Sequence, residues 1–151
     1  MKLFTCAIFA VALIVPAAAR QMQHDKMAMD HRGHQAMGWD QAKATHTFAP
    51  STDGGSIEVA ANDAADKTTI TAIRTHLAEI AKSFKAGDFD KPVFIHAQTP
   101  PGVDAMKRLK GEISYRYEET PKGGKVSITT KNAEAIDAVH AFLKFQQDEH
   151  K

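Results

Sequence analysis

Cysteine is almost absent from this chain of 151 residues, because Cys6 is its only one. If Cys6 is lost with an export signal, the mature protein has no disulfide and no thiolate nucleophile. A transition-metal site would then have to use histidine, methionine and carboxylate. An excess of charge is absent too, with 19 Lys and Arg against 18 Asp and Glu. No strongly basic surface is indicated, so we do not expect nucleic acid as a partner.

The first 19 residues have the pattern of a secretory signal peptide. Lys2 supplies the positive start, residues 3–15 are mostly apolar, and the Ala17-Ala18-Ala19 run offers a small-residue cleavage site. The apolar run is shorter than the about 20 residues that a membrane-spanning helix needs, and no later run approaches that length. We therefore predict a mature protein that begins near Arg20 and is exported to a bacterial periplasm.

Residues 20–43 contain no Leu, Ile, Val or Phe, yet they hold four of the six methionines and three of the eight histidines. Such a segment buries too little apolar surface to offset its ordering entropy, so we expect a flexible arm. It contains two His-x-x-Met pairs, and thioether sulfur with imidazole nitrogen favours Cu(I) and Ag(I). A spacing of three places both donors on one face of a helical turn. The candidate ligands are His24, Met27, Met29, His31, His34 and Met37.

These His-x-x-Met pairs, in an exported segment without cysteine, resemble the periplasmic silver- and copper-binding proteins of bacterial metal-resistance systems. The resemblance covers residues 21–40. It implies low-selectivity capture of a soft metal ion by four residues: His24, Met27, His34 and Met37. The remainder, with residues 95–102 and 115–121, is similar to small exported bacterial proteins of unassigned role.

From residue 44 onward the pattern indicates regular secondary structure in a single domain over residues 44–151. His46 and Phe48 alternate before a turn at residues 50–55, and Ile57 and Val59 alternate after it, which predicts a β-hairpin. A helix follows, capped by Asp63 or Asp66 and ended by Gly87. Its apolar residues recur at spacings of three and four: Ile70, Ile73, Leu77, Ile80 and Phe84.

The second half of the chain repeats this order after two short elements. Residues 91–97 predict a short strand, and residues 100–111 a short helix that buries Met106. A second hairpin is expected around the turn at residues 121–124, and Asn132 caps a final helix through Gln147. We therefore expect an α+β fold: an antiparallel sheet, built from two hairpins and the short strand, with helices on one face. The two hairpin-plus-helix units would then form a weak internal duplication.

Histidines in this domain could form a second metal site. His76 and His140 fall at the edges of the apolar stripes of their helices, where an imidazole most often makes a hydrogen bond at the border of the core. If those helices met the sheet at one place, a His/Met site could form there, an alternative that sequence spacing leaves open. Its candidate ligands are His76, His96, Met106 and His140.

The sequence contains no Gly-x-Ser-x-Gly, no His-Glu-x-x-His and no phosphate loop, so we expect a binding protein and not an enzyme. We predict a periplasmic copper- or silver-binding protein that acts as a buffer or chaperone in metal tolerance. Three alternatives stay open: an exported interaction module for a membrane efflux partner, a small periplasmic enzyme with a His/Tyr pocket, and a noncovalent haem protein with Met106 as an axial ligand. Trp39 is expected to anchor the arm to the domain or to cover a bound Cu(I), with anchoring favoured.

Overall fold

The computed structural model describes residues 17–150. Most of the predicted signal peptide therefore lies outside the described residues, and its last three residues begin the first helix, α1 (Ala17–Met37). Of the helices in the described part of the chain, none is sufficiently long and apolar to cross a membrane.

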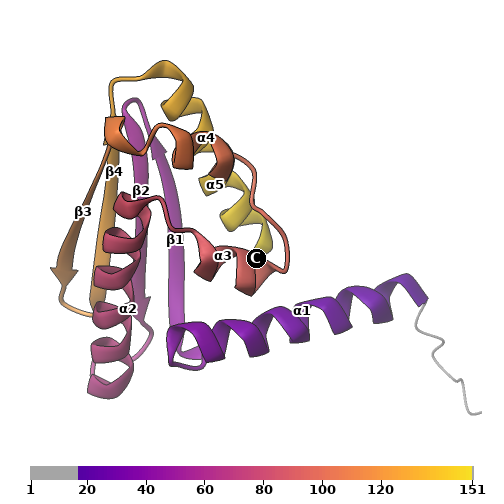
Figure 1. The fold of residues 1–151 in the computed structure, drawn as a ribbon. Helices are drawn as coiled ribbons and strands as arrows, with labels where there is room; N and C mark the ends of the chain where they lie inside the picture. The colour runs from indigo at the N-terminus through magenta and orange to yellow at the C-terminus, as the bar shows by residue number, and fades with distance from the viewer. Residues whose placement is uncertain (1–16, 151) are drawn as a thin grey trace, which may run out of the picture.

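The sheet consists of two antiparallel hairpins, as predicted. The first joins β1 (Ala44–Ser51) to β2 (Gly54–Ala61), and the second joins β3 (Ile113–Thr120) to β4 (Gly123–Thr130). The strand order is β1-β2-β4-β3, so the two central strands, β2 and β4, pair with each other and each hairpin forms one side of the sheet (Figure 1). The fold is α+β.

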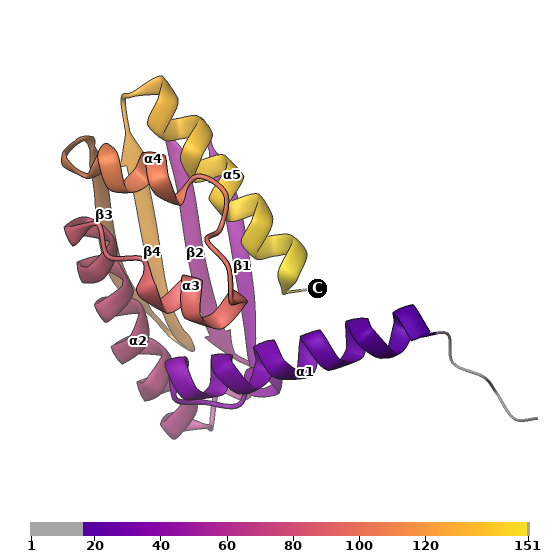
Figure 2. The ribbon, with the colours of Figure 1, turned by 45° about the vertical axis from the view of Figure 1, so that its right-hand side comes forward.

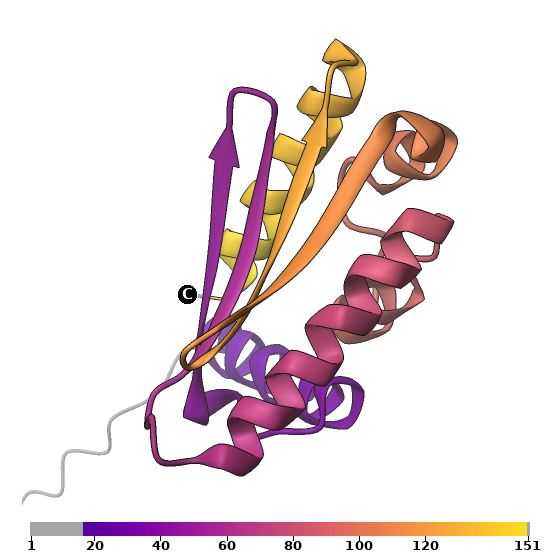
Figure 3. The same cartoon turned by 90° about the vertical axis from the view of Figure 1, so that its left-hand side faces the viewer.

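Two long helices cover the same face of this sheet. Helix α2 (Lys67–Ala86) packs mainly on β3 and β4, whereas α5 (Ala133–Glu149) packs mainly on β1 and β2. The helix after the first hairpin therefore packs mainly on the second hairpin, and the helix after the second hairpin packs mainly on the first (Figures 2 and 3). The edge strands carry exposed side chains on the other face, among them Thr45, Thr47, Ser114 and Arg116.

Glycine pairs begin both central strands at equivalent positions. Gly55 lies opposite Ile128, and Gly123 lies opposite Ala60. A Cβ atom on Gly123 would stand 2.1 Å from the carbonyl oxygen of Val59, so a larger residue would push the central strands apart. The recurrence of this feature in both hairpins agrees with the expected hairpin–helix duplication.

The helix ends follow the expected capping residues. The Asp66 carboxylate accepts a hydrogen bond from the backbone N–H of Thr69 at 3.0 Å, and Gly87 ends α2 with a φ of 82°. The Asn132 side chain caps α5 in the same way through the N–H of Ala135. The predicted short helix is α4 (Val103–Arg108), which is followed by a 3-10 turn, η2 (Lys110–Glu112).

The strand predicted at residues 91–97 is wrong, because this segment forms helix α3 (Asp90–His96). Phe89, Pro92 and His96 are buried at helical spacing, while Phe94 is exposed. Proline fits the first turn of a helix, where its missing N–H would have no partner. The short apolar run at 93–95 is therefore part of a helix, and the described sheet has four strands.

The arm that we expected to be flexible is helical in the structure, with α1 followed by a 3-10 turn, η1 (Gln41–Lys43). Methionine and tryptophan supply the apolar surface that the composition lacks otherwise, since Met29, Met37 and Trp39 are all buried. The Arg32 guanidinium Nε also donates a 2.8 Å hydrogen bond to the carbonyl oxygen of Ile95, near the end of α3. Helix α1 thus packs against α3 (Figure 2).

Substitution of Gly123 tests the close approach of the central strands. We expect Gly123→Ala to lower the free energy of unfolding by about 2 kcal/mol or more, because the new methyl group would overlap the Val59 carbonyl. Gly111→Ala is the matched control, since a Cβ there meets no atom within 4 Å. Urea unfolding of the two variants measures the difference, and equal stabilities would contradict this account of the sheet.

Candidate functional site

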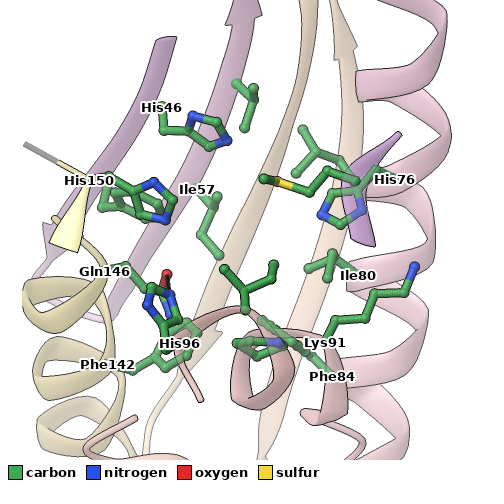
Figure 4. Close-up of a pocket in the computed structure, with 16 residues that line it drawn as sticks. His46, Ile57, His76, Ile80, Phe84, Lys91, His96, Phe142, Gln146 and His150 are labelled. Atoms are coloured by element: carbon green, nitrogen blue, oxygen red, sulfur yellow. Dashed lines mark hydrogen bonds between the residues drawn. The ribbon is translucent and has the colours of Figure 1, made fainter. Parts of the chain in front are cut away.

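Four histidines from four elements line one small pocket between the helices and the sheet. They are His46 of β1, His76 of α2, His96 at the end of α3 and His150 just after α5. The other lining residues are mostly apolar, and Met37 of α1 is one of them. Figure 4 shows His46, His96 and His150 on one side of this pocket and His76 across from them.

The imidazole rings contact one another in a continuous row. His46 and His150 stack, with ring centroids 5.0 Å apart and an interplanar angle of 19°. His96 meets His150 edge-on at 5.6 Å. Trp39 extends the row, because it lies against His46 at 6.2 Å and edge-on to His76 at 5.4 Å. Trp39 is therefore buried between histidines of the domain, as anchoring of the arm requires.

Two imidazole nitrogens in this row are buried without a hydrogen-bond partner. His96 uses its Nε2 to contact the Oε1 of Gln146 at 2.9 Å, and an amide oxygen only accepts, so the His96 proton is assigned to Nε2. The Nδ1 of His96 then carries a lone pair, and it makes no hydrogen bond. The Nε2 of His46 is unpartnered as well. Because buried polar atoms normally find partners, these nitrogens mark a place where a ligand would be stabilised.

Burial keeps these imidazoles uncharged. Removal from water lowers the pKa of His46 and of His76 to about 4, and that of His150 to about 3. The pKa of His96 is also lowered, mainly by burial, although its contacts with Gln146 and Glu149 oppose the change. At neutral pH the four rings are therefore neutral, which is the form of histidine that binds metals.

The pocket is too small for an organic cofactor. Its volume is about 60 Å³, whereas pockets for drug-sized ligands have about 300–1,000 Å³. The space suits an ion or a few water molecules. A haem group does not fit, and Met106, its candidate axial ligand, is fully buried on α4 and does not border the pocket. Tyr115 and Tyr117 do not line it either.

The four residues of the candidate second site do not come together. His76 and His96 line the same pocket, whereas Met106 belongs to the core. His140 lies elsewhere, with its Nε2 2.8 Å from the carbonyl oxygen of Ser51 at the first hairpin turn. Among residues 17–150, no three His, Cys, Asp or Glu side chains are arranged to hold a metal ion in the conformation described.

The six donors predicted in the arm lie on two opposite faces of α1. Four of them are exposed and recur at spacings of three, four and three, which places them along one face. We call His24, Met27, His31 and His34 the exposed stripe. Met29 and Met37 are buried with Gly33 on the face that packs on the domain. The second member of each His-x-x-Met pair is therefore placed differently: Met27 is exposed and Met37 is buried.

Sequence reasoning missed His46 and His150 as site residues, although both had a pattern that could have identified them. His46 alternates with Phe48, which faces the core, so its side chain points inward too. His150 follows Val139, Leu143 and Gln146 at spacings of four, three and four, so it continues the buried stripe of α5. Only the folded chain shows that both stripes end at the same pocket.

No family model matches this chain, and comparison with curated proteins and with solved structures gave no significant match. The assignment of the site therefore depends on its own geometry.

The metal-free protein should lose stability as the pH falls from about 7 to about 4.5. An unfolded histidine binds its proton near pH 6.5, whereas folded His76, beside His46, Lys91 and Glu79, binds one only near pH 4. Between these values the unfolded state binds more protons, so acid favours unfolding. For His76 alone the full difference corresponds to about 3 kcal/mol.

Urea unfolding across this pH range measures the effect. His76→Gln should flatten the pH dependence, because glutamine does not titrate, and its own stability near pH 7 provides the reference. An unchanged dependence in that variant would contradict the burial of a neutral His76.

Proposed function

We propose that this protein binds copper or silver ions in the periplasm and acts as a buffer or chaperone in metal tolerance. The observation that carries the proposal is the exposed stripe of α1, where three imidazoles and one thioether share a face and all four side chains are exposed. Export is inferred from the signal-like pattern of residues 1–19.

The donor set favours a soft monovalent ion. Cu(I) and Ag(I) accept few ligands and bind imidazole nitrogen and thioether sulfur, whereas Mg²⁺ and Ca²⁺ require several oxygens. Met27 lies three positions after His24, and His31 lies four positions after Met27, so each pair spans about one helical turn. Adjacent pairs can thus share an ion without unwinding α1.

Exposure of these donors suits a protein that takes up and releases metal. Met27 is 65% exposed, and the three histidines of the stripe are exposed as well. An ion bound there stays accessible to a second protein, so a membrane efflux component is the kind of partner that we propose. The opposite face of α1 keeps the helix packed on the domain through Met29 and Met37.

Removal of the exposed stripe tests the proposal. The variant His24→Ala, Met27→Ala, His31→Ala and His34→Ala should bind fewer Cu(I) or Ag(I) ions than the wild type, and the affinity of the lost sites should fall by about tenfold or more. Its thermal midpoint should stay close to that of the wild type, because all four side chains are exposed. Anaerobic competition with a chromophoric Cu(I) chelator measures affinity and stoichiometry.

Gln23→Ala with Gln35→Ala is the matched control, since both glutamines are exposed on α1 and neither supplies a soft donor. This control should bind metal as the wild type does. Identical titrations of the wild type and the stripe variant would show that the stripe is not the binding surface.

A further inference from the structure

We propose that His46, His96 and His150, together with Met29 of α1, form a second, buried site for one soft monovalent cation. This inference rests on the proposed function, since it assigns a second place to the same class of metal. It differs from the sequence-based expectation, because it combines a buried methionine of the arm with domain histidines that include His46 and His150.

The spacing of the rings fits a shared ion. Two imidazoles that bind one ion at about 2.0–2.1 Å have ring centroids about 5–6 Å apart. The centroids of His46 and His150 are separated by 5.0 Å, and those of His96 and His150 by 5.6 Å. The rings now stack or meet edge-on, so binding one ion requires their side chains to rotate until the nitrogens converge.

Nitrogen lone pairs are already present at this place. The side chain of His96 is 1% exposed, and its Nδ1 lacks a hydrogen-bond partner. The Nε2 of His46 is buried and unpartnered in the same pocket. An ion between them would satisfy two nitrogens that otherwise pay a desolvation penalty. Gln146 holds the other nitrogen of His96 and so fixes which atom faces the ion.

Met29 supplies the thioether from the other side. Two surface hollows adjoin the histidine row, one bordered by His96 and the other by His46 and His150. Met29 borders both hollows, and it is 6% exposed. These hollows also connect the row to solvent, so they give an ion a path of entry beside α1.

The charges around these hollows favour a cation of low charge. Their rims carry four carboxylates, from Asp25, Asp30, Asp148 and Glu149, against the cationic groups of Lys26 and Arg32. Glu149 is the carboxylate nearest to the row, with its Oε2 3.9 Å from the Nδ1 of His96. Asp148 is itself paired with Lys144 at 2.7 Å, so these groups carry one more negative than positive charge, which a monovalent ion balances and a divalent ion would exceed.

The experiment uses the full mature chain in which the exposed stripe has been replaced by alanine, titrated anaerobically with Ag(I). We expect one equivalent to bind. The ring ¹⁵N resonances of His46, His96 and His150 should shift, while those of His76 and His140 stay in place. His150→Gln added to this variant should weaken binding by about tenfold or more. His140→Gln is the matched control and should leave the affinity unchanged, because that ring bonds to Ser51 outside the pocket.

The outcomes separate this inference from the proposed function. If the wild type binds Ag(I) and the stripe variant binds none, the buried site is refuted and the exposed stripe stands. If the stripe variant binds as many ions as the wild type, and the three ring resonances shift, the buried site stands and the exposed stripe is refuted. Binding to the stripe variant without any shift of these three rings also overturns the buried site, and this readout does not require the added His150→Gln substitution.

Discussion

The packing of α1 against α3 determines which soft donors of α1 are buried and which are exposed. Met29 and Met37 are buried on one face of the helix, and Arg32 binds the carbonyl of Ile95 near the end of α3. With that face fixed, residues about half a helical turn away from it face solvent, and Met27 and His31, two positions on either side of Met29, are exposed. A single packing interface therefore separates an accessible donor set from a buried one.

The buried histidines form an uncharged cluster in a mostly apolar pocket, where polar atoms normally need hydrogen-bond partners. Imidazoles in this row give up hydration, and two of their nitrogens gain no protein partner in return. Such unpaired buried atoms cost about 1–3 kcal/mol each. The cost is tolerated within a core that includes the aromatic contacts of Phe84 with Phe89 and Phe142. Proteins commonly accept such a loss of folding stability at a functional site and compensate for it by packing elsewhere.

Periodicity alone predicts both hairpins, the long helices and their caps, because each depends on local spacing and on one capping residue such as Asp66 or Asn132. It fails at α3, where a short apolar run is too brief to distinguish a strand from a helix. It also fails for the arm, because composition counts Leu, Ile, Val and Phe and overlooks the burial of Met29, Met37 and Trp39.

The candidate site shows the same division. The exposed donors of α1 can be named from the sequence, since His-x-x-Met is a local pattern. The buried cluster cannot, because it joins His46 and His150, which are separated by most of the domain, through a contact that only the sheet order and the course of α5 produce. Of the four candidate ligands of the second site, His76 and His96 line the same pocket, whereas Met106 and His140 do not.

X-ray absorption at the copper edge of the Cu(I)-loaded mature protein shows which donor atoms bind the ion. We expect a first coordination shell that contains both imidazole nitrogen and thioether sulfur. A shell of nitrogen and oxygen alone, with no sulfur scatterer, would contradict this expectation.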